Sequence, residues 1–279
     1  MKDEIRNYTE PEKFLESRMI LHRFYKNISS GYMLVQPLMK AENLLPDQYA
    51  DLLKLQYILV TCLRCVTDLN FMQGSDAFNR PRLARHNICE VLRSITDTLN
   101  EILFIDTDIH IDFQHEGEEL FTELDVPRVE YILFSIIENS LLYGPKDVKI
   151  VLRLKQKDKH IHISVKEKSS AIAKQDFEAL FDKYKRVTSG TINPTVRQGL
   201  SLALAKQAAE EMDGALLAEN QKTGLKLTLI LPCRGASVGA KDNPYTLEPE
   251  KIYMVFADYL LEKLKKQAEQ AGLPVPTDI

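Results

Sequence analysis

The sequence of 279 residues has no tryptophan, only four cysteines and no long apolar run. Two of the cysteines, Cys62 and Cys65, are closely spaced, but they lie in a segment with helical apolar periodicity and have no second pair nearby. We therefore expect free thiols in a reducing compartment rather than disulfides or a zinc site. No apolar run approaches the roughly 18 residues of a membrane span, and the first residues lack the apolar core of a secretion signal. We expect no membrane span and a cytoplasmic location.

The chain also lacks a large excess of charge of either sign. It has 36 lysines and arginines and 40 acidic residues, which gives a net charge of −4. This balance predicts no nucleic-acid partner and no general affinity for anionic membranes. Hydrophobic residues make up 44% of the chain, enough to bury a core. The length suggests about two domains.

Residues 14–43 and 47–72 both show long helical patterns. Pro37 lies inside the first pattern and predicts a kink, whereas Pro46 and Asp47 suit the first turn of the second. Two such helices predict an antiparallel hairpin with an exposed apolar stripe, which a second copy would cover in a four-helix bundle. We therefore predict a homodimer. The apolar seam of the first helix is Leu21, Tyr25, Ile28, Tyr32, Val35 and Met39.

After a turn-rich hinge at 74–81, helical and strand patterns alternate. The predicted helices cover 83–103, 125–143, 177–184 and 199–212. The predicted strands cover 109–117, 148–156, 160–168 and 224–232. This order predicts an α+β domain with helices on one face of a mixed sheet.

A small polar linker and a further helix over 247–271 follow this domain. The helix has an apolar stripe, so we expect it to dock back on its own domain, with a partner or dimer contact as the alternative. The predicted domain limits are an N-terminal segment 1–13, a hairpin 14–75, a sheet domain 76–232, and a linker with the C-terminal helix 233–279.

One strongly polar residue, Asn139, interrupts the apolar helix over 133–144. An amide on such a helix needs a partner, since leaving it unpaired costs roughly 1–3 kcal/mol. Asn139 could bond to nearby backbone, or it could order a metal–triphosphate group while Tyr143, four positions later, stacks on a base. This segment alone leaves both interpretations open.

Four segments in a fixed order, IIENSLLYG, HIHISVKEKSSAI, FEALFDKYKR and RQGLSLALAKQAAEEMDGAL, resemble the catalytic core of sensor histidine kinases. The resemblance covers nearly all of residues 14–232. It implies a dimerisation hairpin followed by a two-layer α/β sandwich of the Bergerat (GHKL) ATPase type. The cofactor that it implies is ATP or ADP with magnesium.

The resemblance also assigns the nucleotide-binding residues position by position. Asn139 matches the asparagine that holds magnesium in the family, and Tyr143 matches an aromatic residue that can stack on adenine. Glu167 stands where the family has an aspartate that accepts a hydrogen bond from the adenine amino group, although both glycines of that motif are replaced. Gly199 is the retained glycine of the last motif, and Arg197 beside it could add charge to a phosphate site.

The phosphoacceptor histidine of the family has no counterpart here. Alignment through Leu34 and Pro37 places Tyr32 at the histidine position and Met33 at the acidic one, and a second alignment places Ser30 there. Neither alignment supplies an imidazole.

We therefore predict a histidine kinase-like signalling protein without a catalytic residue for autophosphorylation. It would be a dimeric regulator that binds a response regulator or a histidine kinase. The alternative is an enzyme, a divergent ATP-binding kinase or ATPase that uses Asn139, Glu167 and Arg197. A third reading, a phosphotransfer bundle with a vestigial ATPase domain, also needs a histidine. The sequence leaves its status as an enzyme open.

Overall fold

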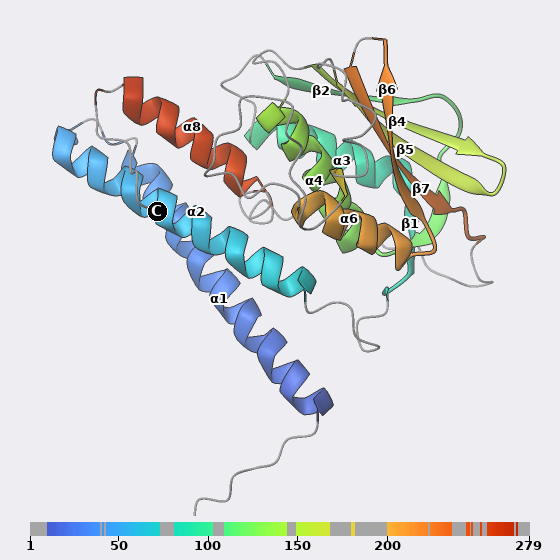
Figure 1. Cartoon of the computed structure of the whole chain (residues 1–279), viewed down its shortest axis with the longest axis horizontal. Helices are drawn as coiled ribbons and strands as arrows, with labels where there is room; N and C mark the ends of the chain where they lie inside the picture. Colours follow the sequence, from blue (N-terminus) through green and yellow to red (C-terminus); the bar gives the residue numbers. More distant parts are fainter. Residues whose placement is uncertain are drawn as a thin grey trace, which may run out of the picture. The chain divides into compact units, whose positions relative to one another are not determined.

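The computed structural model describes residues 10–39, 41, 43–72, 81–102, 109–143, 149–167, 180–181, 200–222, 224–235, 244–245, 247, 252, 256–270 and 272. Figure 1 labels its helices and strands. The chain divides into two compact units, one of Met1–Asn79 with Leu260–Ile279 and one of Arg80–Tyr259. None of the described helices combines the length and the apolar character needed to cross a membrane.

The first unit contains the predicted helical hairpin. Helix α1 (Glu10–Met39) packs against α2 (Pro46–Met72), and the seam between them is apolar. α1 includes Pro37 but ends at Met39, so it does not reach residue 43 as predicted. The Gln48 side chain accepts a hydrogen bond from the backbone N–H of Leu45 at 3.1 Å, which helps to fix the start of α2. The buried seam includes Tyr32, Val35, Leu53, Tyr57, Val60 and Leu63.

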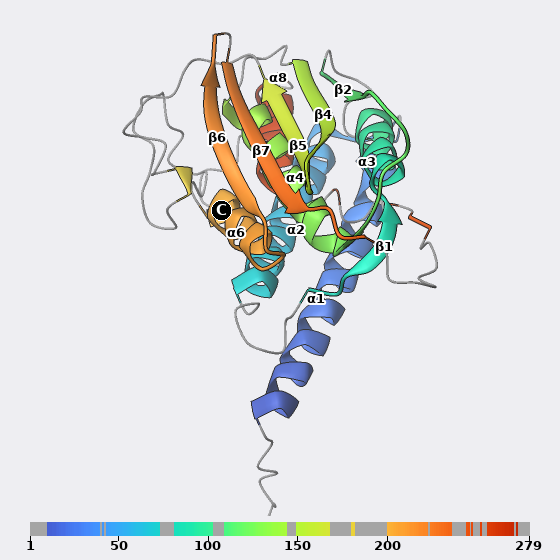
Figure 2. The same cartoon turned by 90° about the vertical axis from the view of Figure 1, so that its right-hand side faces the viewer.

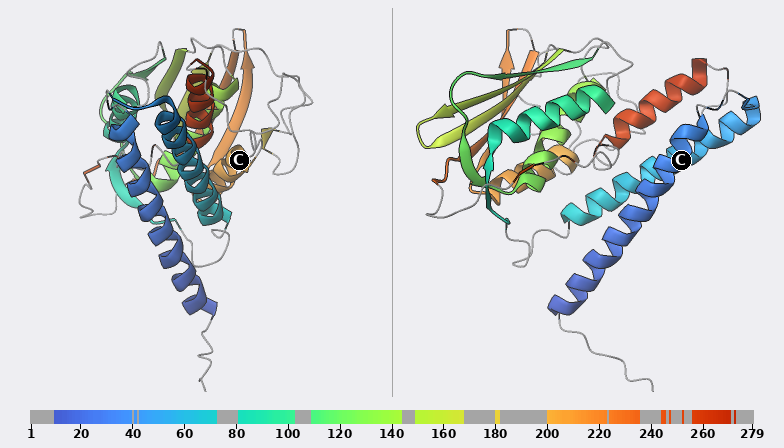
Figure 3. Two further views of the ribbon diagram at one scale, coloured as in Figure 1. Left: turned by 90° about the vertical axis from the view of Figure 1, so that its left-hand side faces the viewer. Right: turned by 180° about the vertical axis from the view of Figure 1, so that it is seen from behind.

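A five-stranded mixed sheet forms one layer of the second unit. Its strand order is β2 (His110–His115), β4 (Lys149–Lys157), β5 (His160–Glu167), β7 (Gly224–Pro232) and β6 (Ala215–Gln221). Only the β2–β4 pair is parallel. Helices α3 (Ile88–Ile102), α4 (Val126–Tyr143) and α6 (Leu200–Glu210) form the other layer, on one face of this sheet (Figure 3). The predicted α+β class and two-layer sandwich are confirmed.

A second, small sheet pairs β1 (Ala84–Asn87) with β3 (Phe121–Leu124). The sequence patterns predicted neither strand and extended the following helix back to residue 83, which is wrong. The Asn87 side chain accepts a hydrogen bond from the N–H of Cys89 at 3.2 Å and so caps α3, whose first residue is Ile88. Strand β6 was not predicted either.

Apolar residues at helical spacing fill the space between the helices and the sheet. The predicted face of α3, from Ile88 to Leu99, is fully buried, as are Ile132 and Ile136 of α4. The Asn100 side chain both donates to and accepts from the backbone of Ile111 at 3.0 Å, which fastens α3 to β2.

Glycine is required where α6 turns into β6. The Gly214 N–H donates to the Ala209 carbonyl at 2.9 Å, a hydrogen bond typical of a helix C-terminus. A Cβ atom at Gly214 would collide with the Ile230 carbonyl oxygen, so a side chain is excluded there.

The predicted C-terminal helix is only partly described. Ile252 is helical, and its carbonyl accepts a hydrogen bond from the Phe256 N–H at 3.0 Å. Helix α8 spans Ala257–Gln270, and Leu247, the predicted first residue, is not helical. Most of the predicted hinge and of the predicted helix over 177–184 lies outside the described residues.

Candidate functional site

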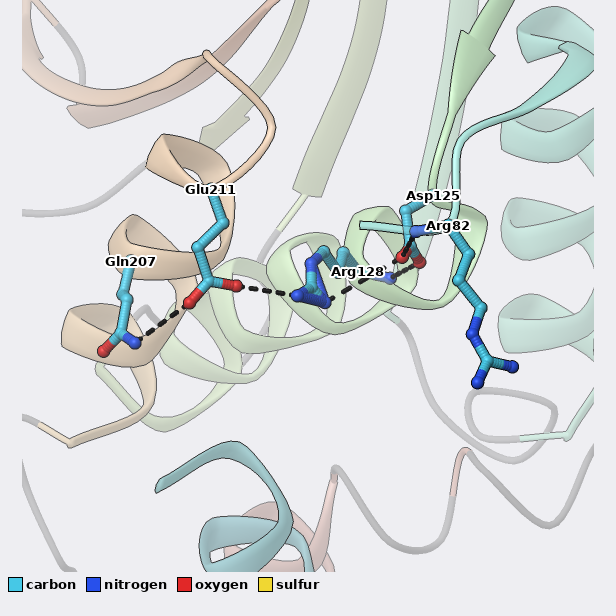
Figure 4. Close-up of polar contacts among 5 residues, drawn as sticks. All are labelled: Arg82, Asp125, Arg128, Gln207 and Glu211. Carbon is cyan, nitrogen blue, oxygen red and sulfur yellow. Dashed lines mark hydrogen bonds and ion pairs between the residues drawn. The ribbon is translucent and has the colours of Figure 1, made fainter. Parts of the chain in front are cut away.

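The start of α4 is fixed by the side chain of Asp125, which precedes its first residue. Its Oδ2 accepts a hydrogen bond from the N–H of Arg82 at 2.8 Å, and its Oδ1 accepts one from the N–H of Arg128 at 3.2 Å (Figure 4). A carboxylate at this position satisfies backbone donors that have no partner inside the helix and complements the helix dipole. Asp125 thereby joins the segment before β1 to α4.

A chain of polar side chains runs from Asp125 to α6 through Arg128, which is only 8% exposed. The Arg128 guanidinium lies 2.8 Å from Glu211 Oε2 and 3.8 Å from Asp125 Oδ2. Gln207 in turn donates to Glu211 Oε1 at 3.0 Å (Figure 4). The cation is therefore paired on both sides, and it holds α4 and the C-terminal end of α6 together.

Asn139 is half-buried although Glu138 and Ser140, on either side of it, are buried. The Ser140 hydroxyl donates to the Ile136 carbonyl at 3.1 Å. Asn139 is therefore the partly exposed residue between two buried polar neighbours on α4. Ser135, one helical turn earlier, is fully buried, and its hydroxyl has no hydrogen-bond partner among the described residues.

Glu167 is the last residue of β5 and is 4% exposed. It lies opposite Ile150 and Leu225 on the neighbouring strands. The structure thus places a buried carboxylate at the end of a central strand, where the resemblance expects the group that meets adenine. Within the described part of the chain, no group of three or more His, Cys, Asp or Glu side chains could hold a metal ion.

The other predicted nucleotide-binding residues are only partly described. Tyr143 is the last residue of α4, four positions after Asn139, but its side chain lies outside the described set. Arg197 and Gly199 also lie outside it, just before the first residue of α6. The structure therefore brings Asn139 and Tyr143 to one end of α4 and leaves the predicted phosphate contacts untested.

The two predicted phosphoacceptor positions differ in accessibility. Tyr32 is 2% exposed and belongs to the seam between α1 and α2, whereas Met33 next to it is 45% exposed. Ser30 is exposed. A nucleophile must reach the γ-phosphate, and the Tyr32 hydroxyl does not have that access in this arrangement.

A stripe on α4 that the sequence analysis missed is contacted by Tyr245, Phe256 and Tyr259 from the C-terminal part of the chain. The Tyr245 hydroxyl donates to Glu130 Oε1 at 2.7 Å, the Phe256 ring lies 5.4 Å from the Phe134 ring, and the Tyr259 N–H donates to Glu138 Oε1 at 3.4 Å. Burial raises the pKa of the Tyr259 hydroxyl. Glu130, Phe134 and Glu138 are four residues apart, and this spacing was the available signal. These three residues dock on their own unit.

The comparisons with known proteins agree with this geometry. Residues 124–235 match the family described as histidine kinase-, DNA gyrase B- and HSP90-like ATPases. This segment is similar to the ATPase domains of that family. The sensor histidine kinase WalK of Bacillus subtilis (strain 168) is 29% identical over 128 residues, which are 44% of this chain and 21% of WalK. The sensor histidine kinase CusS of Escherichia coli O157:H7 is 22% identical over 177 residues, which are 63% of this chain and 36% of CusS.

Solved structures show the same fold. Full-length ShkA in complex with AMPPNP has a TM-score of 0.62 at 18% identity, covering 82% of this chain and 47% of ShkA. Histidine kinase ThkA in complex with the response regulator TrrA has a TM-score of 0.51 at 19% identity, covering 81% of this chain and 68% of that chain. The resemblance to a histidine kinase catalytic core is confirmed. The chain spans between about a fifth and just over a third of the two curated relatives.

Proposed function

We propose that this protein is a histidine kinase-like regulator that does not phosphorylate itself and acts by binding a two-component partner. The observation that carries the proposal is the burial of Tyr32 in the seam between α1 and α2, because one of the two sequence alignments places Tyr32 at the position of the phosphoacceptor histidine. The other alignment places Ser30 there, which also supplies no imidazole. A phenol with a pKa near 10 is a weak nucleophile at neutral pH. Met33 beside it supplies no carboxylate to activate it.

The outer surface of the hairpin supports a homodimer. Each helix exposes apolar side chains at helical spacing, with exposed fractions from 42% to 70%. A stripe of this kind is a protein-binding surface rather than a solvated one, and a second hairpin would cover it in a four-helix bundle. The stripe consists of Ile20, Phe24, Leu34 and Leu38 on α1 and Leu55, Ile58 and Leu69 on α2.

The solved complex of ThkA with a response regulator is the reason to name the partner class. On that likeness we take a response regulator as the first candidate partner and a histidine kinase as the second. The cytoplasmic location expected from the sequence stays a prediction.

Labelling with radioactive ATP and magnesium tests the loss of autophosphorylation. The full chain should acquire no acid-labile phosphate, and the variant Tyr32→Phe should behave identically. Acid-labile label on the full chain would contradict the proposal. Acid-stable label that disappears in Tyr32→Phe would instead identify the tyrosine as an acceptor.

The homodimer has a separate test by light scattering on a sizing column. Leu34→Lys places a charge in the middle of the proposed interface and should yield monomers. Ala41→Lys adds the same charge at an exposed position in the hairpin turn and should leave the dimer intact. A wild-type chain that is monomeric at micromolar concentration would rule this interface out.

A second candidate function, nucleotide binding by a divergent kinase or ATPase, is favoured by Asn139, which is half-buried between two buried neighbours. Calorimetric titration with ATP and ADP in the presence of magnesium should then show binding that Asn139→Ala weakens. Lys166→Ala, an exposed change beside Glu167, is the matched control. No heat and no thermal shift at millimolar nucleotide would exclude this function.

A further inference from the structure

One face of the five-stranded sheet packs on α3, α4 and α6, and the other face is turned away from these helices (Figure 2). Side chains alternate along each strand, so Ile150, Leu152 and Leu154 of β4 are buried and the residues between them point outward. We call the outward residues of these strands the outer sheet face. Its cations are Lys149, Arg153, Lys155 and Lys157 on β4, Lys166 on β5 and Lys226 on β7.

The strand register sets like charges directly opposite one another on this face. Lys166 is the cross-strand partner of Lys226, which makes one directly opposed pair of cations. Lys155 lies opposite His162, whose imidazole is neutral at pH 7. Directly opposed like charges destabilise a sheet. Glu219, 3.2 Å from Lys226, offsets the charge on that side of the pair only, so an anion near Lys166 would relieve the remaining repulsion. The pKa of His162 is lowered first by burial and then by Lys157, His160 and Lys226, so the histidine does experience these cations.

The acidic residues of the outer sheet face lie at its margins. Asp112 and Glu219 are on the edge strands, and Asp158 is in the turn between β4 and β5. Glu219 pairs with Lys226 at 3.2 Å, and Asp112 accepts a hydrogen bond from Gln114 at 2.6 Å.

Among the described residues, most of the cations on this face are therefore not neutralised by a carboxylate. In the part of the chain that the structure describes, no carboxylate forms an ion pair with Lys155, Lys157 or Lys166. Lys155 and Lys157 lie further along β4, opposite His162 and His160. Lys149, Arg153 and Lys226 lie within about one Debye length of Lys166, roughly 10 Å at 0.1 M salt, because strands are about 4.8 Å apart and a residue adds about 3.3 Å along a strand. They act together as one positive patch in a chain whose net charge is −4.

The residue types on this face distinguish between anionic partners. Protein interfaces are enriched in arginine and aromatic residues and depleted in lysine, but five of the six cations here are lysines. Sheet faces that bind single-stranded RNA stack bases on aromatic side chains, and the described outward residues of this sheet include no Phe or Tyr. Strongly hydrated lysine ammonium groups on flexible stems suit a fluid layer of anionic headgroups, which needs no fixed geometry.

We propose that the outer sheet face docks on the surface of an anionic phospholipid bilayer. Binding would be peripheral, electrostatic and sensitive to salt. The net charge of the chain does not indicate this affinity, because it does not show that positive residues are gathered on one face.

Sedimentation of the full chain with lipid vesicles tests the proposal. The chain should sediment with vesicles of equal parts phosphatidylglycerol and phosphatidylcholine, less so as salt rises, and should not sediment with phosphatidylcholine alone. Each lysine near an anionic surface contributes about fivefold in binding. The double variant Lys155→Glu with Lys166→Glu should therefore lose at least about 25-fold.

The matched control makes the same change in charge elsewhere. Arg93→Glu with Lys54→Glu alters two exposed cations outside the outer sheet face and should retain most of the binding. Loss of fold is checked by the thermal midpoint, which should not fall in the test variant because Lys166→Glu replaces a repulsive pair with Lys226 by an attractive one.

Four outcomes would overturn the proposal. The first is no sedimentation with the anionic vesicles at low salt, and the second is equal sedimentation with neutral vesicles. The third is an equal loss in the control variant. The fourth is displacement from the vesicles by duplex DNA at equal phosphate concentration, which would identify a nucleic acid as the better ligand.

Discussion

Replacing Arg128 with methionine tests whether the polar chain between α4 and α6 holds the ATPase-type unit together. Breaking a buried ion pair by removing one partner costs about 3–5 kcal/mol. The cost here should be smaller, because the Glu211 side chain is 26% exposed and keeps its bond from Gln207. Asp125 likewise keeps two backbone donors. Since methionine fills much of the space of the arginine stem, we expect Arg128→Met to lower the free energy of unfolding by about 2–3 kcal/mol.

Urea unfolding with hydrogen exchange is the appropriate assay, because the chain has no tryptophan to report on tertiary structure. With a urea slope of about 2 kcal/mol/M, the expected loss lowers the midpoint in far-ultraviolet circular dichroism by about 1–1.5 M. A chain with two compact units need not unfold in one step. Protection of α4 amides should therefore fall in Arg128→Met while protection of α1 and α2 amides stays the same.

A double-mutant cycle isolates the pair itself. Glu211→Gln alone should cost less than Arg128→Met, and the double variant should show a coupling of about 1–2 kcal/mol. A coupling near zero, or a loss of protection confined to the hairpin, would refute the idea that Arg128 joins α4 to α6.

Three further changes have defined outcomes. Ser135→Ala removes a buried hydroxyl that has no described partner and should raise the free energy of unfolding by about 1 kcal/mol, seen as a higher urea midpoint; an unchanged or lower midpoint contradicts this. Phe256→Ala removes a fully buried ring from Phe134 and should make the segment 244–259 more susceptible to limited proteolysis, whereas Phe256→Leu should do so less. Because the pKa of His162 is lowered in the folded chain, the unfolded chain binds the proton first, so stability should fall as the pH drops below about 6.5. The variant His162→Gln should lack that part of the decline in urea midpoint.

The spacing of apolar residues in the sequence predicted the helices and strands that bury one continuous face. The apolar spacing from Ile88 to Leu99 determined the buried side of α3, and the same reasoning located α4, the central strands and the hairpin. It failed for β1 and β3, because each has only four residues and their pairing joins positions far apart in the chain. Short strands of this kind are stabilised by their partner and by what covers them, and neither can be read from a local pattern.

The difference between local patterns and contacts far apart in the chain also explains which residues of the candidate site were predicted and which were missed. Asn139 could be singled out because one amide on an apolar helix is conspicuous in the sequence. The sequence analysis did not single out Glu130 and Glu138, yet both are buried. Their partners Tyr245 and Tyr259 come from more than a hundred residues later in the chain, so no local pattern points to these contacts. The outer sheet face was missed for another reason. The net charge counts all residues of the chain together, whereas the alternation of side chains along the strands gathers the cations on one face.

The contacts that position α4 come from within the chain. Asp125 caps its first turn, Arg128 fastens it to α6, and the stripe around Phe134 is contacted by the C-terminal part of the chain. None of these contacts uses a nucleotide, so α4 can keep its place when the phosphate-binding glycines of the family are replaced. A domain that keeps its shape without ATP can go on presenting a surface to a partner after the transfer chemistry is gone. This independence supports the proposed role in binding, and it predicts that saturating nucleotide changes the protection of α4 amides by much less than Arg128→Met does. A nucleotide-dependent ordering of the whole helix would favour the ATP-binding alternative instead.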